Sequence, residues 1–420
     1  KNIYIPIEIV NREFNGKLRL AQELKGLGHN VVIGYSMEMI WNINRTDCDI
    51  LIINNADYQS NLFKVLKKFK NSGGHICLLE NEGAVFVDQV DVLNRLDYRM
   101  TNLIDTYFAW SKNIATIVGN ADLGFKNVCV SGHPMFDIYH EASVGNKVSS
   151  NFNPSSEKFI LVNTNFALIN EAVSGQYDFI GDVHYRNHLR TIMLEMMSLV
   201  NKLSDELSVD IVIRPHPSES HDFYKNRFHD HPNVHVIHDG PVVNWIADCS
   251  MLIHNSCTTA IEAFILDKKI VSWQPVKDYR FDLNIANNLG IVCVSYDDVK
   301  NTWLSEYKKR EHDENVLYSL GNKSSPIIAR EIDKLKLSYG NQIFSPWNLS
   351  FKGIKETVKH YLFDTNLSFI LPKDHLREME YFKAKFPFIN EVDVVQMADK
   401  YGIKVGVRKL KLFKKVWKLI

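Results

Sequence analysis

The chain repeats one pattern twice: short apolar runs alternate with amphipathic helical segments, and a break separates the two stretches. In the first stretch, residues 1–141, the expected strands are Ile3–Ile9, Val31–Tyr35, Asp49–Asn54, His75–Leu79, Tyr107–Trp110 and Val128–Ser131. Between the first two of these, Lys17–Leu27 places its leucines at helical spacing and stops at Gly28, where a helix C-terminus favours glycine. Strands alternating with helices of this length indicate a parallel, doubly wound sheet.

The pattern lapses over residues 142–158, which are rich in Ser, Asn and Pro and are typical of a linker. It then resumes with a long helical segment near Asn187–Leu207 and the strands Phe159–Asn163, Val209–Arg214, Val234–Ile237, Met251–His254 and Lys269–Trp273. We therefore predict an α/β protein with two Rossmann-like domains, 1–141 and 159–340, facing a central cleft. A helical segment, 341–420, is expected to follow. Ligands of such folds bind at the carboxyl ends of the strands.

Composition excludes several classes of function. Lys+Arg and Asp+Glu both total 49, so no overall charge attracts the chain to nucleic acid. The six cysteines are scattered without a C-x-x-C pair, which disfavours a zinc or redox site and favours a reducing cytoplasm. No run of 18 apolar residues predicts a membrane-spanning helix.

Two polar motifs follow strands of the second domain. In the first, prolines end the strand, and Arg214 and His216 form a basic pair suited to phosphate oxygens. The whole motif is Arg214, Pro215, His216, Pro217, Ser218 and Glu219. The second is the start of a helix with small polar residues, where Glu262 follows Thr259 by three positions as in a capping box. The whole motif is His254, Asn255, Ser256, Thr258, Thr259 and Glu262. A rigid turn and an ordinary helix cap are the alternative interpretations, but two such strand ends in one domain favour an anion site.

Candidate catalytic groups lie in the first domain. Glu80 and Glu82 follow an expected strand, and burial of one could raise its pKa towards neutrality, as a general acid or base requires. Glu82 is preferred because Gly83 frees the backbone beside it; a solvated loop is the alternative. Further residues at strand ends that could line the acceptor side of the cleft are Glu8, Arg12, Glu13 and His133.

No metal site is expected. Asp47 and Asp49 have D-x-D spacing but precede their strand, and His229 and His231 read as a solvated loop.

The chain's last segment is strongly basic. Lys404–Ile420 carries seven basic residues and no acidic one. On a helix its apolar residues would gather on one side and its lysines on the other, a pattern typical of helices that lie on anionic membranes. We therefore expect Arg408–Ile420 to bind the inner face of the cytoplasmic membrane. A packing helix or a partner-binding helix is the alternative.

Several motifs together resemble one family. Ile5–Phe14 with Gly16-Lys17, Glu80–Gly83, Gly132–Asp137, Val162–Phe166, Arg214–Glu219 and His254–Ala263 are similar to those of the bacterial surface carbohydrate biosynthesis proteins. That group resembles the GT-B β-Kdo transferases of capsule and O-antigen assembly. The resemblance covers roughly residues 1–340.

The resemblance implies a CMP-activated 3-deoxy-ulosonic acid, Kdo or a nonulosonic acid, as the donor and co-substrate, with no metal and no other cofactor. His216, Pro217 and the hydroxyls of residues 256–259 would hold its phosphate, and Glu82 would act in catalysis. The family's retaining enzymes use an Asp nucleophile shortly after the first strand of this domain, but this chain departs from that pattern: its first Asp residues there are Asp178 and Asp182, and Asp182 is the candidate. Asn163 and Asn165 are expected on the acceptor side of the cleft.

The expected function is transfer of this sugar to a surface-polysaccharide or lipid-linked glycan. The alternatives are a UDP- or GDP-sugar transferase, a UDP-sugar 2-epimerase-like enzyme on the same fold, and a non-catalytic glycan-assembly scaffold.

Overall fold

The computed structural model divides the chain into two compact units. Unit 1 comprises Lys1–Gly83, Val90–Glu141 and Asp313–Ile420, and unit 2 comprises Ala84–Gln89 and Ala142–His312. The structure describes residues 1–84, 86–142, 152, 158–170, 183–240, 242–282, 284–308, 315, 317, 324–337, 386, 390–399, 406–410 and 415–420.

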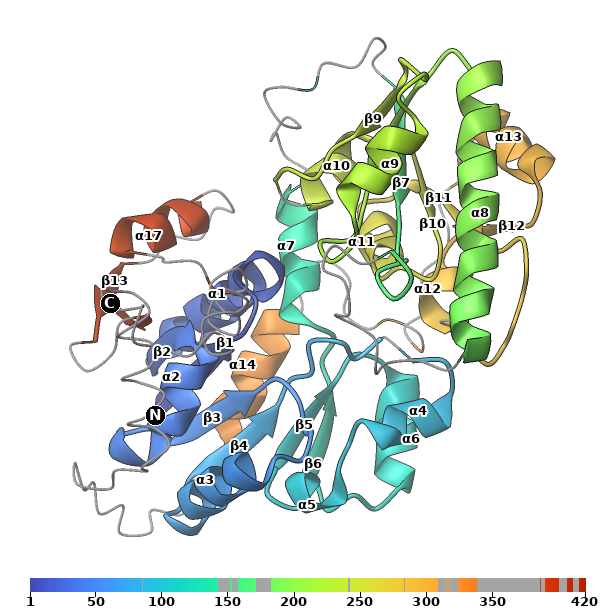
Figure 1. Ribbon diagram of the computed structural model, residues 1–420. Helices are drawn as coiled ribbons and strands as arrows, with labels where there is room; N and C mark the ends of the chain where they lie inside the picture. The colour runs from blue at the N-terminus through green and yellow to red at the C-terminus, as the bar shows by residue number, and fades with distance from the viewer. Residues whose placement is uncertain are drawn as a thin grey trace, which may run out of the picture. The chain divides into compact units, whose positions relative to one another are not determined.

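Unit 1 is built on an eight-stranded sheet in the order β13-β14-β2-β1-β3-β4-β5-β6 (Figure 1). The pairs from β2 to β6 are parallel, whereas β13 and β14 run antiparallel. The strands are β1 Asn2–Ile7, β2 Asn30–Tyr35, β3 Ile50–Ile53, β4 His75–Leu78, β5 Thr106–Ala109, β6 Asn127–Val130, β13 Val407–Lys409 and β14 Val416–Leu419. All six strands predicted for this part of the chain are present.

The helices of unit 1 follow the predicted alternation. They are α1 Val10–Gly26, α2 Ser36–Trp41, the short 3-10 helix Ile43–Arg45, α3 Ser60–Asn71, α4 Gln89–Asn94, α5 Tyr98–Thr101, α6 Lys112–Asn120, α7 Pro134–Ala142, α14 Ser324–Lys334 and α17 Glu391–Asp399. α1 begins seven residues before the predicted start at Lys17. The Glu13 carboxylate explains the earlier start, because it accepts the backbone N–H groups of Glu8 and Ile9 at 2.9 and 2.6 Å.

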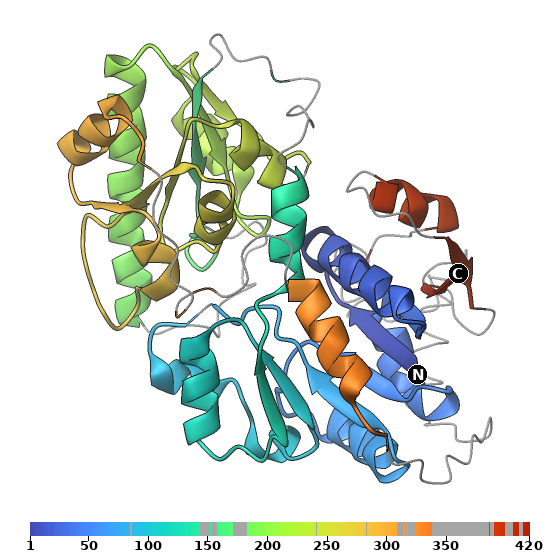
Figure 2. The same cartoon turned by 180° about the vertical axis from the view of Figure 1, so that it is seen from behind.

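The predicted boundary at residue 340 is wrong, because α14 belongs to unit 1. This helix runs beside α1, as Figure 2 shows (orange beside dark blue). Asp137 of α7 accepts the backbone N–H groups of Ser324 and Ser325 at 3.1 and 2.7 Å. These bonds satisfy donors at the start of α14 that have no partner within the helix.

The predicted amphipathic helix at the end of the chain is also wrong where the structure describes it. β13 and β14 pair with each other, and β14 adds to the edge of β2, with Trp417 opposite Ile33. Val416 and Trp417 are fully buried. These two apolar side chains are therefore buried in an added edge strand, and the described part of the segment does not form the helix from which membrane binding was expected.

Unit 2 contains a six-stranded parallel sheet in the order β12-β11-β10-β7-β8-β9. Its strands are β7 Phe159–Asn163, β8 Asp210–Arg214, β9 Val234–Val236, β10 Met251–His254, β11 Lys269–Trp273 and β12 Ile291–Cys293. Strand β12 has exposed Ile291 and Val292 and was not predicted.

Helices cover both faces of this sheet. They are α8 Val183–Glu206, α9 His221–Arg227, α10 Val242–Asp248, α11 Thr259–Ile265, α12 Asn284–Asn288 and α13 Tyr296–Leu304. α8 and α13 bury one apolar cluster against β7, β8 and β10, while Trp245 of α10 and Ala260 of α11 belong to a second cluster on the other face. None of the described helices is long and apolar enough to cross a membrane.

Candidate functional site

The sheet of unit 2 changes direction between β7 and β10. From β7 the chain moves outward through β8 to β9, and then returns to the other side of β7 to add β10, β11 and β12. Open parallel sheets bind ligands outside the carboxyl ends of the strands at such a reversal. Both predicted motifs of this domain lie in the loops after β8 and β10, next to the loop after β7.

Glu219 ties the loop after β8 to the loop after β7. Its buried carboxylate accepts the Thr164 hydroxyl at 3.0 and 2.9 Å and the Phe166 N–H at 2.8 Å. The hydroxyl of Tyr224 donates to the same carboxylate. Burial nevertheless raises the pKa of Glu219. The side chain predicted to contact the nucleotide is therefore used inside the protein, where it fixes two loops.

Arg214 is also committed within unit 2. Its guanidinium donates to the carbonyls of Asp239 and Gly240 at 2.8 and 2.5 Å, and it lies 6.0 Å from the Trp245 ring. Burial lowers its pKa to about 10. The predicted phosphate ligand thus holds the loop that follows β9.

The exposed part of the first motif is His216 and its neighbours. Pro217 is exposed and Ser218 is half-buried. The Ser218 N–H donates to Nδ1 of His216 at 3.2 Å, so the neutral ring carries its proton on Nε2. An exposed imidazole N–H at a strand end can donate to an anionic oxygen.

In the second motif, His254 has a supporting role. It is fully buried, its Nε2 lies 3.1 Å from the Ser272 hydroxyl, and its Nδ1 accepts the Cys257 N–H at 3.3 Å. Burial lowers the pKa of His254 to about 3. The neutral ring joins β10 to β11 and to the turn before α11.

That turn has an unusual backbone. Ser256 has a φ of 44°, a left-handed conformation that non-glycine residues seldom adopt. Asn287 of α12 holds it by accepting its N–H at 3.2 Å and donating to its hydroxyl at 2.9 Å. The exposed Thr258 is the N-cap of α11 and makes no side-chain capping bond, so the capping box predicted for Thr259 and Glu262 is absent.

The loops after β7 and β10 are joined across the reversal. The Asn165 N–H donates to the Asn255 side-chain carbonyl, and the Asn165 amide donates to the Ser256 carbonyl, both at 3.2 Å. Asn165, predicted on the acceptor side, is therefore part of the unit 2 loop network. Asn163, at the end of β7, lies beneath these loops and is buried.

Two histidines at this edge were not predicted. The rings of His221 and His238 lie 5.0 Å apart, and His238 Nδ1 is 2.9 Å from the Pro215 carbonyl. Burial, followed by the neighbouring Arg214, lowers the pKa of His238 to about 4. His238 stands just after β9, so the strand-end criterion used for His216 would have found it.

Unit 1 has a charged cluster at the carboxyl ends of β1 and β3. The buried Lys17 ammonium pairs with Glu13 and donates to the Pro6 carbonyl at 2.7 Å and to the Asn54 side-chain oxygen at 2.5 Å. Burial lowers the pKa of Lys17. Glu13 is therefore a buried member of this cluster, and the Glu8 N–H is one of its partners.

The two candidate carboxylates of unit 1 differ in environment. Glu80 is buried, it accepts the Tyr107 hydroxyl, and burial raises its pKa. Glu82 is 55% exposed and pairs with Arg12 at 2.7 Å. The environment expected of a general acid or base is found at Glu80, whereas the sequence favoured Glu82.

His133 lies on the same edge of unit 1. It is fully buried, its Nδ1 accepts the Met135 N–H at 3.2 Å, and its ring lies 4.6 Å from Trp110. Burial lowers its pKa well below the usual value, and the charges of Lys17 and Arg12 act in the same direction. His133 is therefore a neutral ring beside two cations.

Asp182, the predicted nucleophile, lies outside the described residues. Among the residues described, no group of three or more His, Cys, Asp or Glu side chains could hold a metal ion.

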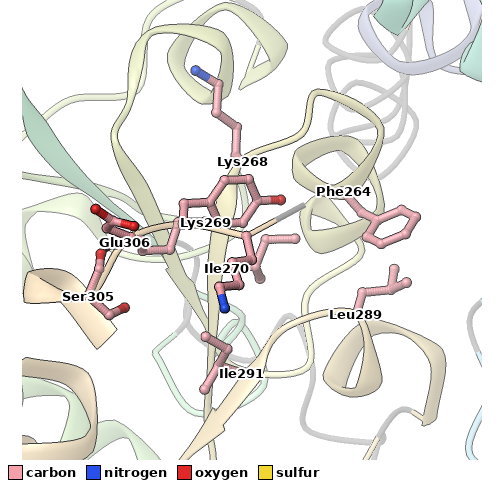
Figure 3. A pocket seen from close by; sticks show the side chains of 10 residues that line it. Phe264, Lys268, Lys269, Ile270, Leu289, Ile291, Ser305 and Glu306 are labelled. Atoms are coloured by element: carbon pink, nitrogen blue, oxygen red, sulfur yellow. Dashed lines mark hydrogen bonds between the residues drawn. The ribbon is translucent and has the colours of Figure 1, made fainter. Parts of the chain in front are cut away.

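A pocket is present elsewhere in unit 2. Figure 3 shows it beside Lys269 and Ile270 at the start of β11 and Ile291 at the start of β12. Lys269 donates to the carbonyls of Thr302 and Ser305 at 2.9 and 2.6 Å. The pocket lies at the amino ends of the strands, and two of its lysines, Lys268 and Lys269, donate to backbone carbonyls, so we place the candidate site at the opposite edge.

No family model matches the sequence, and no curated protein matches it. Solved structures do match. The UDP-GlcNAc 2-epimerase from Neisseria meningitidis bound to UDP-GlcNAc is 13% identical, with a TM-score of 0.53, over 80% of this chain and 100% of that chain. The UDP-GlcNAc 2-epimerase from Methanocaldococcus jannaschii is 10% identical, with a TM-score of 0.53, over 79% and 99%. These likenesses confirm the predicted two-domain, GT-B-like α/β fold.

Proposed function

We propose that this chain is an enzyme that acts on a nucleotide sugar, and that the loops after β7, β8 and β10 hold the nucleotide. The observation that supports this best is the meeting of three polar loops at the reversal of the unit 2 sheet, where Glu219 and Asn165 join them. The likeness in fold to UDP-GlcNAc 2-epimerases, one of them bound to UDP-GlcNAc, adds support for a sugar nucleotide.

The residues of these loops divide into two roles. The exposed or half-buried groups, His216, Ser218 and Thr258, would donate to phosphate oxygens. The buried groups, Glu219 and His254, would hold those donors in place. Donors fixed before the ligand arrives lose little entropy on binding, so such a site binds an anion without a lysine or a metal.

We infer a UDP-sugar as the substrate, with an epimerase-type reaction. Inverting C2 of a UDP-sugar requires a base to remove the C2 proton while the C1–O bond to UDP breaks, and then an acid to return a proton to the other face of C2 while UDP adds back to C1. Taken within unit 1 alone, Glu80 has the environment of a proton-transfer group, because burial raises its pKa and the Tyr107 hydroxyl donates to its carboxylate.

Transfer of an ulosonic acid from a CMP donor is the second candidate. It is supported by the motifs 214–219 and 254–263, which resemble those of the surface carbohydrate biosynthesis proteins. Only this reaction needs a glycan acceptor, so the two candidates differ in what must be added to obtain turnover.

Calorimetry with UDP, CMP and GDP separates the candidates, followed by NMR of the products from UDP-GlcNAc and from CMP-Kdo. We expect UDP to bind most tightly and UDP-GlcNAc to be converted without an acceptor. CMP binding without conversion of UDP-GlcNAc would instead favour the transferase, and transfer of Kdo from CMP-Kdo to an added glycan acceptor would establish it. If none of the three nucleotides binds, the enzyme proposal fails and a scaffold function is favoured.

A matched pair of histidine variants tests the site itself. His216→Ala should weaken nucleotide binding by about tenfold, as expected for loss of one hydrogen bond to a charged group. His229→Ala removes an exposed histidine of the loop after α9 and should leave binding unchanged. Equal affinities of the two variants would argue against the loop after β8 as the phosphate site.

A further inference from the structure

Asn163 occupies the centre of a polar row across the unit 2 sheet. It is the last residue of β7 and lies in register with His254 of β10 and Arg214 of β8. Residues in register on parallel strands place their side chains on the same face of the sheet. The alternate residue on each strand, such as Leu161, packs with Trp245 and Ala260, so this is the face covered by α10 and α11.

The amide of Asn163 makes no hydrogen bond within the described part of the chain. The residue is 3% exposed, and among the described residues neither Oδ1 nor Nδ2 has a hydrogen-bond partner. Its neighbours in the row are engaged elsewhere: Arg214 donates to the carbonyls after β9, and His254 bonds to Ser272. A buried amide with both atoms unpaired costs free energy, which a hydrophobic residue of similar size would avoid.

This unpaired amide stands at the ligand-binding point of the fold. Asn163 ends the strand at which the sheet reverses direction, directly before the loop in which Asn165 bonds to Asn255 and Ser256. The unpaired amide therefore lies at the strand end next to the point where the loops after β7 and β10 meet.

We propose that Asn163 recognises the nucleobase of the bound nucleotide through its hydrogen-bonding edge. The amide presents one donor and one acceptor side by side, so its full complement is a group with an acceptor and a donor side by side. Uracil offers N3–H beside O4, and cytosine offers N3 beside its amino group, whereas a phosphate has acceptors alone. Bidentate pairing of an Asn amide with a base edge is well known in nucleic-acid recognition.

This inference rests on the proposed nucleotide site, and its test separates the two. Calorimetry compares the tighter binder of UDP and CMP with the same nucleotide methylated at N3 of the base, which blocks the edge and leaves the phosphate unchanged. For the wild-type protein we expect methylation to weaken binding by roughly 10- to 100-fold, in keeping with a bidentate pair. Asn163→Leu should bind both forms with similar, reduced affinity.

Thermal unfolding supplies an independent readout. In the absence of ligand, Asn163→Leu should unfold at a higher temperature than wild type, because it removes the unpaired amide. Asn42→Leu is the matched control: Asn42 is buried in unit 1 and donates to the Glu38 carbonyl at 2.9 Å, so its loss should lower the unfolding temperature and leave nucleotide affinity unchanged.

Each result bears on a different part of the argument. If the wild type binds a nucleotide but N3-methylation leaves its affinity unchanged, the role of Asn163 is overturned and the nucleotide site stands. A ligand-free Asn163→Leu protein that unfolds well below wild type would also overturn it, because the amide would then have a structural partner. If neither UDP nor CMP binds, the proposed function fails and the inference fails with it.

Discussion

Lys17 and Glu13, one turn apart on α1, form an ion pair in which neither side chain has any exposed surface. Glu13 also receives the N–H groups of Glu8 and Ile9, while Lys17 donates to Pro6 and Asn54. The pair therefore joins the start of α1 to the carboxyl ends of β1 and β3. Because both charges are buried, each offsets the free-energy cost of removing the other from water.

Removing one member of this pair should be strongly destabilising. Lys17→Met leaves the Glu13 carboxylate buried without its counter-charge, and we expect the free energy of unfolding in urea to fall by about 3–5 kcal/mol. Glu23→Ala breaks the half-exposed Arg19–Glu23 pair on the same helix and should cost under about 1 kcal/mol. Similar losses in the two variants would contradict the structural role of the buried pair.

Gly16 lets the first turn of α7 approach α1 closely. A Cβ at Gly16 would lie 2.8 Å from the Met135 backbone nitrogen, whereas a Cβ at Gly26 of the same helix would meet nothing within 4 Å. Gly16→Ala should therefore destabilise the protein by about 1–3 kcal/mol despite the better helix propensity of alanine. Gly26→Ala should be neutral or stabilising by up to about 1 kcal/mol. Thermal and urea unfolding of both variants tests the contact.

His254 should make the protein sensitive to acid. Its pKa is about 3 in the folded protein and about 6.5 when unfolded, so between these values the unfolded chain binds the extra proton. The stabilising contribution is complete above pH 6.5 and is lost as the pH falls, by about 2 kcal/mol at pH 5. His254→Gln should flatten the dependence of urea unfolding on pH between 7 and 5. The exposed His229, replaced by Gln, should leave the slope unchanged.

The end of the chain should contribute to the stability of unit 1. Trp417 is fully buried opposite Ile33 of β2, so Trp417→Ala should cost about 3–5 kcal/mol. Ile420, half-exposed just after β14, gives the control: its replacement by Ala should cost under about 1 kcal/mol. An unfolding curve for Trp417→Ala that matches wild type would show that β14 is dispensable.

The fold could be predicted from the sequence wherever the local pattern of apolar residues determines the structure. The strands from β1 to β11 were predicted because each is a short apolar run followed by a helix. The tail was not predicted, because a short mixture of apolar residues and lysines such as Val416, Trp417 and Lys418 fits a lysine-rich helix as well as an edge strand. Their pairing with β2, almost 400 residues earlier in the chain, decides between the two, and local sequence does not contain that information.

The candidate site was predictable in position but not in the role of each side chain. The rule that ligands bind at the carboxyl ends of parallel strands identified the loops after β8 and β10. Whether a polar residue there faces a ligand or supports a loop depends on tertiary partners: Arg214 and Glu219 are bound internally, whereas His216 is exposed. For the same reason Glu80 is a better candidate for the acid or base than Glu82, although the sequence favoured Glu82. Glu80 is buried because it lies against Tyr107 and Trp110, which both donate hydrogen bonds to it.

Unit 1 is assembled from both ends of the chain, with unit 2 inserted between them. A ribosome therefore delivers all of unit 2 before it delivers α14, α17 and β14. The nascent chain must keep the edge of β2 uncovered until β14 emerges, so unit 1 completes its sheet only after all of unit 2 has been synthesised. Termination between unit 2 and β14 would release a protein with a complete unit 2 and an open β-sheet edge in unit 1.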